Sequence, residues 1–133
     1  MVDRIILFRA CICLVVLALL NGLATEFYWY TSVFGFDKAM HTLGGITVAL
    51  LGGAWFLKRS EGLSPFQTFV TLTLCTFVVG LAWEYYEYLV QFFIKGVHLA
   101  DIPDSIGDLI FDIIGGAIGS FLVILIKRRY NRR

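Results

Sequence analysis

The sequence predicts an all-α, polytopic membrane protein with four transmembrane helices and an interfacial segment after the first of them. Hydrophobic residues make up 59% of the 133-residue chain and charged residues only 16%. Long apolar stretches recur along the chain, each close to the roughly 20 residues that cross about 30 Å of hydrocarbon as a helix. A soluble domain of this size could not bury so much apolar side chain, so we expect a single membrane domain over residues 1–133.

The first predicted helix runs from Ile5 to about Ala24 and contains one charge, Arg9, which lies close enough to the end to reach the lipid head groups. A basic start followed by the small residues of Gly22-Leu23-Ala24 would also suit a cleaved signal peptide. We interpret the segment as a retained transmembrane helix.

A connecting segment follows, from Glu26 to Asp37. Its run Phe27-Tyr28-Trp29-Tyr30 has the amphipathic aromatic character that is typical of the boundary between lipid and water. We therefore expect this segment to lie along the membrane surface.

Three further helices are predicted: Lys38 to about Leu57, about Phe66 to Ile94, and about Ser105 to Ile126. Residues 58–62 form the turn between the first two of these, and Pro65 lies near a helix start, where proline is favoured. Small residues at four-residue spacing mark faces on which helices approach closely in lipid. These residues are Gly45, Ala49 and Gly53 in the second helix and Gly115 and Gly119 in the last.

The basic residues predict the orientation of the chain. Nine of the eleven lie on one side of the predicted membrane: Arg4, Arg9, Lys58, Arg59, Lys127, Arg128, Arg129, Arg132 and Arg133. The other two are Lys38 and Lys95. Because cytoplasmic loops carry an excess of Lys and Arg, we expect an inner-membrane protein with both termini in the cytoplasm. We read the basic tail as a topology anchor and expect no nucleic-acid partner.

Six of the ten acidic residues lie within, or at the outward end of, the last three predicted helices. They are Asp37, Glu84, Glu87, Asp104, Asp108 and Asp112. Asp104, Asp108 and Asp112 form one helical stripe at four-residue spacing, Glu84 and Glu87 share a face, and Asp37 lies one turn before His41. A charge at mid-bilayer costs about 2.5–3.5 kcal/mol, so such groups usually face the protein interior and serve a function.

So many carboxylates in a low-dielectric pocket need compensation, and Lys38 and His41 are the only cationic candidates nearby. Protons or a divalent metal ion would have to neutralise the rest. We expect Glu84, Glu87, Asp108 and Asp112 to be the metal ligands, and Asp37, Lys38 and His41 to be catalytic. Oxygen ligands with at most one imidazole suit Mg, Mn, Ca, Fe or Zn, so the identity of the metal stays open.

The order of these motifs resembles the small VanZ-like and YjdF-like bacterial membrane proteins. The resemblance rests on Asp37-Lys38-Ala39-Met40-His41, on Glu84 in the following helix, and on an aspartate- and glycine-rich last helix from Asp104 to Gly119. It implies that Asp37, Lys38, His41, Glu84 and Asp108 form one site, and an association with the cell envelope, in the VanZ-like case with reduced sensitivity to a glycopeptide antibiotic. VanZ-like proteins typically carry asparagine in place of Asp112, and YjdF-like ones are longer.

Three functions fit these residues. The first is a metal-assisted enzyme acting on a lipid or lipid-linked envelope substrate, with Lys38 steering a phosphate and His41 acting as acid or base. The second is transport of protons, cations or small solutes, for which residues 113–126 offer no ionisable group, so that a complete pathway would need a homo-oligomer or a hydrated groove. The third is a non-catalytic accessory or assembly protein whose polar cluster fixes the helix arrangement.

Overall fold

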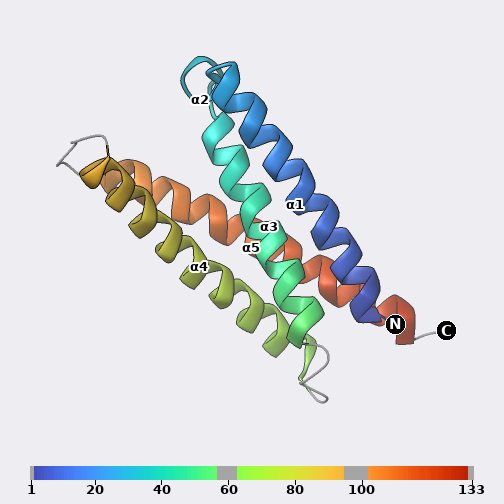
Figure 1. Ribbon diagram of the computed structural model, residues 1–133. Helices are drawn as coiled ribbons and strands as arrows, with labels where there is room; N and C mark the ends of the chain where they lie inside the picture. Colours follow the sequence, from blue (N-terminus) through green and yellow to red (C-terminus); the bar gives the residue numbers. More distant parts are fainter. Residues whose placement is uncertain (1, 57–62, 95–101, 132–133) are drawn as a thin grey trace.

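The computed structural model describes residues 2–56, 63–94 and 102–131, which form five helices and no strand (Figure 1). In chain order they are α1 (Val2–Glu26), α2 (Trp29–Ser32), α3 (Phe36–Phe56), α4 (Pro65–Phe93) and α5 (Ile102–Asn131). All except the single-turn α2 are long and apolar enough to cross a membrane. The predicted all-α fold with four transmembrane helices is therefore confirmed. The predicted turn at 58–62 lies outside the described residues, as do Lys95, Arg132 and Arg133.

The helix ends follow local chemistry. Ser64 caps α4: its side chain accepts a hydrogen bond from the backbone N–H of Gln67, whose side chain in turn accepts one from the backbone N–H of Ser64. Pro65 occupies the first helical position, as predicted. α5 continues five residues past the predicted end at Ile126, because basic side chains end an apolar span without ending a helix and are favourable at a helix C-terminus.

The connection between α1 and α3 is a tight, aromatic turn. Gly35 has a φ of 73°, in the left-handed region that glycine adopts at little cost. The Tyr30 hydroxyl donates a 2.7 Å hydrogen bond to Asn21 Oδ1 on α1, and the Tyr30 ring meets that of Phe36 edge-on at 5.3 Å. These contacts hold α2 against the end of α1 and the start of α3.

The bundle is organised around α3. In Figure 1, α3 lies between α1 and α4, with α5 crossing behind it, and both termini lie far from α2. α3 packs against α1, α4 and α5, whereas α1 and α4 share no contact within the described ranges. The end of the bundle that carries α2, together with the start of α3, the end of α4 and the start of α5, is called the α2 end below.

α3 and α5 approach closely through small residues. A Cβ added to Gly45 would collide with the α5 backbone, and one added to Gly115 would collide with the α3 backbone. One added to Gly119 would lie 2.7 Å from the Cβ of Ala49. The two predicted small-residue faces therefore meet each other, as expected for helices that associate in lipid.

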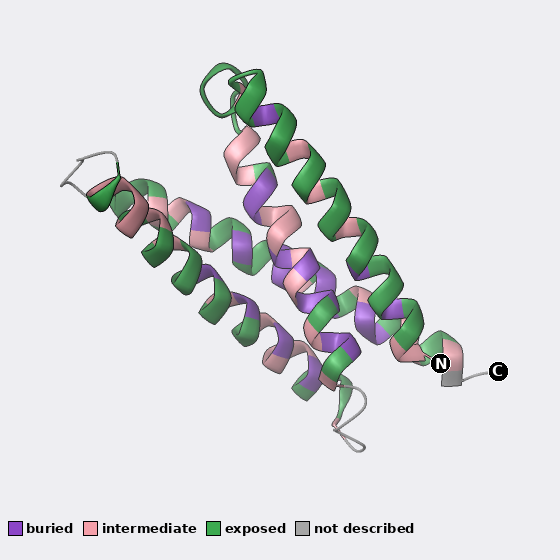
Figure 2. Ribbon diagram, in the orientation of Figure 1, coloured by how far each residue is buried: buried purple, intermediate pink, exposed green. Residues whose placement is uncertain are grey.

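Apolar and polar burial are separated along the bundle. The apolar core lies toward the termini and consists of Ile6, Ala10, Leu50, Ala54, Leu72 and Val123. The buried charged residues lie toward the α2 end. Figure 2 shows that α1 is mostly exposed. Large apolar side chains such as Phe8, Leu19 and Val78 are exposed on the outer faces. Such a surface suits lipid rather than water.

We predict that Gly115→Ala destabilises the protein by about 1–3 kcal/mol, because the new methyl group must push α3 and α5 apart. Gly22→Ala is the matched control: it lies in a transmembrane helix with nothing within 4 Å of the added Cβ, and should be neutral or stabilising. Reversible unfolding in mixed micelles measures both. Equal stability of the two variants would contradict the tight α3–α5 crossing.

Candidate functional site

Lys38 joins α3 to α5. Its ammonium lies 2.6 Å from Asp104 Oδ1 and 2.7 Å from Asp108 Oδ1, and 3.7 Å from Asp37 Oδ2. The side chain of Lys38 is 25% exposed, whereas that of Asp108 is only 3% exposed. The lysine therefore compensates one buried carboxylate and one that lies near the surface, as charge-assisted hydrogen bonds of this length do.

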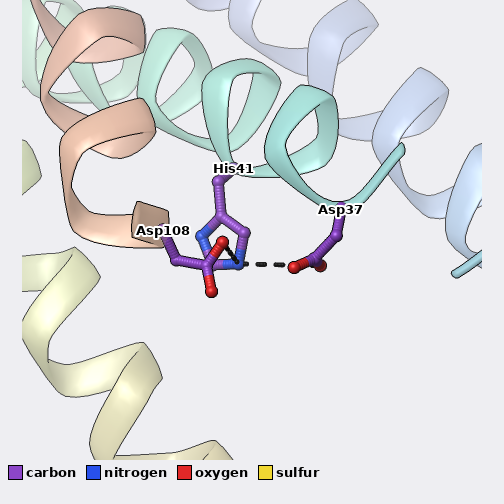
Figure 3. Close-up of side chains that lie close together, drawn as sticks. All are labelled: Asp37, His41 and Asp108. Carbon is purple, nitrogen blue, oxygen red and sulfur yellow. Dashed lines mark ion pairs between the residues drawn. The ribbon is translucent and has the colours of Figure 1, made fainter. Parts of the chain in front are cut away.

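His41 lies at the centre of four carboxylates and is only 7% exposed. Its Nε2 atom is 3.6 Å from Asp108, 3.9 Å from Asp37 and 4.0 Å from Glu84, while Nδ1 is 3.4 Å from Asp112. Figure 3 shows the imidazole and Asp37 reaching from α3 toward Asp108 on α5. One ring thus collects acids from three helices, which is the convergence that the sequence predicts.

Asp112 is the acid of the α5 stripe that lies farthest along the helix from the α2 end. It is 6% exposed, and its Oδ2 atom has no hydrogen-bond partner among the described residues. A Cβ added to Gly80 on α4 would lie 2.5 Å from that oxygen, so the glycine provides the space that the carboxylate occupies. Glu84 Oε1 is likewise buried without a hydrogen bond in the described part of the chain. Unsatisfied oxygens of this kind are costly and call for a further positive partner.

The charges of the site do not balance. Six carboxylates, Asp37, Glu84, Glu87, Asp104, Asp108 and Asp112, surround one lysine and one histidine within the described ranges. Even with a charged imidazole, four negative charges would remain if every acid were ionised, by six minus two. Asp37 and Asp104 are partly exposed to solvent, but the buried acids need bound protons or a bound cation, because isolated charges are strongly disfavoured in a low-dielectric interior.

Among the described residues, two groups of side chains could hold a metal ion, and His41 belongs to both. One group is Asp37, His41 and Asp108, and the other is His41, Glu84 and Glu87. In each group the ligand atoms lie within 4.8 Å of one another. A single imidazole with carboxylate oxygens is a common donor set for divalent metals.

The structure regroups the residues that the sequence assigns to metal binding. Asp108 joins Asp37 and His41, which were expected to be catalytic, and the two glutamates share that histidine. Asp112 lies on the other side of the imidazole, facing Nδ1. The four-residue spacing of Asp37 and His41 was the sequence signal for the first group, because it brings both side chains to one helix face.

Sequence reasoning missed the contacts of two aromatic residues that lie near the acids. The Trp83 indole N–H donates a 3.0 Å hydrogen bond to Glu87 Oε1, one turn away on α4. Burial and the nearby Asp37 and Glu87 carboxylates raise the pKa of the Tyr30 hydroxyl, so it stays protonated and donates to Asn21. The four-residue spacing of Trp83 and Glu87 is visible in the sequence. The rotation of α4 that turns Glu87 toward His41 is not.

A cleft of about 620 Å³ reaches the site from one side. Its walls come from α1 and α4, α3 forms its floor, and Asp112 of α5 lies at its base. Asp37, His41 and Glu87 border it near α2. The carboxylate cluster is therefore accessible from the space between α1 and α4.

Residues 5–129 match the family described as "Predicted membrane protein (DUF2238)". The chain belongs to this family. The match includes all of the site residues from Asp37 to Asp112, and it supports a small membrane protein. It does not specifically support the VanZ-like or YjdF-like resemblance. No curated protein and no solved structure matches the chain.

We predict that Lys38→Met destabilises the protein by about 3 kcal/mol, the lower end of the range for a broken buried ion pair, because Asp108 loses its cationic partner. Adding Asp108→Asn removes the stranded charge, so the double variant should be more stable than Lys38→Met alone. Reversible unfolding of the wild type, both single variants and the double variant gives the coupling energy. Additive effects would show that the contact contributes nothing.

Proposed function

We propose that this protein is a metal-dependent membrane enzyme that acts on a lipid or lipid-linked substrate of the cell envelope. The observation that carries the proposal is the arrangement around His41, where two groups of potential ligands share one buried imidazole. A buried, unpartnered carboxylate oxygen on Asp112 lies beside the same ring. A divalent cation would supply the positive charge that this arrangement lacks.

Within the part of the chain that the structure describes, the nearby cations Lys38 and His41 do not meet this need. Lys38 already contacts Asp104 and Asp108 at hydrogen-bond distance. Glu84 and Glu87 lie on α4. The basic residue that lies with them in a potential metal group is His41. The predicted role of Lys38 in steering a phosphate remains a hypothesis, alongside its contact with Asp108.

The cleft suggests how the residues would divide the chemistry. A bound metal would polarise a substrate oxygen or lower the pKa of a water molecule. Glu84, Glu87, Asp108 and His41 would hold the ion. Asp37 borders the cleft and has a side chain that is 36% exposed, so it is placed to accept a proton from water or from a substrate hydroxyl.

The charges at the helix ends support a location in the cell envelope. Arg4, Arg9, Lys127, Arg128 and Arg129 lie toward the two termini, whereas Lys38 lies near α2. By the positive-inside rule the termini would be cytoplasmic and the α2 end would face outward across the inner membrane. The VanZ-like and YjdF-like resemblance agrees with an envelope role, and the site would then act on outward-facing lipid.

We predict near-stoichiometric divalent metal in the protein after purification in detergent and dialysis without chelator. Glu84→Gln and His41→Ala should each weaken binding at least about tenfold, because the first replaces a charged carboxylate ligand by a neutral amide and the second removes the imidazole ligand of the group on α3 and α4. Glu26→Gln is the matched control, since Glu26 is an exposed acid at the end of α1. Elemental analysis of the four proteins measures the effect.

Two results would contradict the enzyme proposal. The first is a wild type that holds no metal even after Mg, Mn, Ca, Fe and Zn are each added back. The second is a Glu84→Gln variant that restores the phenotype of a deletion strain as well as the wild type does. The second result would favour an accessory or assembly protein, for which the cluster has only a structural role.

Transport is the second candidate, because buried hydroxyl groups continue beyond Asp112 toward the termini. Thr76 and Ser120 are almost fully buried, and Ser120 Oγ lies 3.3 Å from Thr73 Oγ1. Hydroxyls both donate and accept, so they can extend a proton path that carboxylates begin. Proteoliposomes containing a pH-sensitive dye would test this. Proton flux abolished by Asp112→Asn would replace the enzyme proposal with transport.

A further inference from the structure

The cleft between α1 and α4 has the shape of a site that is open to the membrane. Its two walls share no contact with each other within the described ranges, because α3 separates them. Leu17 and Ala18 line the α1 wall, Val79 lines the α4 wall, and Gly44 and Val48 form the floor. A volume of about 620 Å³ lies within the usual range of about 300–1,000 Å³ for small-molecule sites.

The lining changes character along the cleft. Val48 follows His41 by seven residues of helix, about 10 Å. The part around Val48 is mostly apolar: Leu17 and Val79 lie on either side, and the Thr76 hydroxyl donates to the Leu72 carbonyl of its own helix. The part around His41 instead carries Asn21, Tyr30, Asp37 and Glu87. Such a gradient fits an amphiphile, which has an apolar chain and one polar end.

The charge at the polar end favours a cation. Among the described residues, the ionisable groups that border the cleft are Tyr30, Asp37, His41, Glu87 and Asp112. Three of these five are carboxylates, and Asp112 has a buried oxygen without a hydrogen-bond partner. Lys38 does not border the cleft, and its ammonium contacts Asp104 and Asp108.

The aromatic residues near α2 support the same ligand. Trp83 and Tyr30 both border the polar end of the cleft. Aromatic rings are favourable neighbours for ammonium groups, and this contribution adds to that of the carboxylates. An anionic head group without a counter-ion would instead meet like charge from Asp37 and Glu87.

We infer that this cleft binds an amphiphile with an ammonium head group, whose alkyl chain lies between α1 and α4 and whose amine reaches Asp37 and Asp112, the two cleft carboxylates that the proposed metal ion does not use. The inference rests on the proposed function, because it names the substrate class of the same site. An amine-headed lipid entering sideways from the bilayer would be the natural ligand of this kind.

Dodecylamine binding to the purified protein in a nonionic detergent tests the inference, with dodecanol and dodecyl phosphate as competitors of equal chain length. Unlabelled dodecylamine should displace radiolabelled dodecylamine at least about tenfold better than either competitor, a difference of about 1.4 kcal/mol. Equal displacement by dodecanol, or better displacement by dodecyl phosphate, would overturn the ammonium assignment.

Gly44→Leu tests the location of the site. A Cβ added to Gly44 meets nothing closer than Leu17 Cδ1 at 3.9 Å, so the variant should fold while its side chain fills the cleft. We expect at least about tenfold weaker dodecylamine binding. Gly22→Leu is the matched control, the same substitution in open space on α1, and should bind as the wild type does. Ala18→Leu fills the cleft from the α1 wall and should resemble Gly44→Leu.

Metal content separates this inference from the proposed function. Gly44 and Ala18 are outside both potential metal groups, so their variants should keep the metal content of the wild type while losing dodecylamine. Wild-type protein that binds dodecylamine selectively but takes up none of the added metals would contradict the metal enzyme and leave the amphiphile site intact. Unchanged dodecylamine binding in both filled variants would overturn the amphiphile site, whatever the metal content.

Discussion

The close approach of α3 and α5 is the constraint on which the rest of the site depends. Glycines on both helices allow the two backbones to meet where any larger side chain would collide. That separation is short enough for Lys38 and His41 on α3 to contact Asp108 on α5. In lipid, where apolar surface gains little by leaving the solvent, such packing is a main source of helix association. The same contact thus joins the helices and assembles the charged groups.

Stability and charge are placed in different halves of the bundle. Toward the termini, Leu50, Leu72 and Val123 pack in an apolar core that contains no ionisable side chain. Toward α2, the interior carries acids whose oxygens are only partly satisfied. A polar site that lowers the stability of the protein can persist when another region contributes enough stability. This is the usual relation between activity and stability in proteins. The α2 end therefore carries the charged site, whereas the opposite end supplies the apolar packing.

The sequence predicted the helices and the small-residue faces of α3 and α5, because hydropathy and small-residue spacing report directly on both. That these two faces meet each other was not predicted. The sequence also placed Asp37, Lys38 and His41 beside Asp108, since two helix starts at one membrane surface bring their first turns together. Glu84 was expected in the same site as His41, but the sequence did not indicate the rotation of α4, because this helix has no distinct apolar stripe. It therefore did not show that Gly80 makes room for Asp112. The cleft was equally hidden, because it arises from the missing contact between α1 and α4, and both helices expose apolar residues on most faces.

The two neighbouring stripes of α5 have a consequence for how this helix can vary. Gly115 and Gly119 face α3, while Gly116 and Ser120, one position further along, face α4. In each pair of adjacent positions, 115–116 and 119–120, the first residue is therefore restricted by contact with α3 and the second by contact with α4. Natural variation along α5 should be confined to the remaining positions, such as Ile114, Ile118 and Phe121, where lipid accepts any apolar side chain. The sequence of α5 would then vary among relatives with a period of four residues, in which two restricted positions are followed by two variable ones.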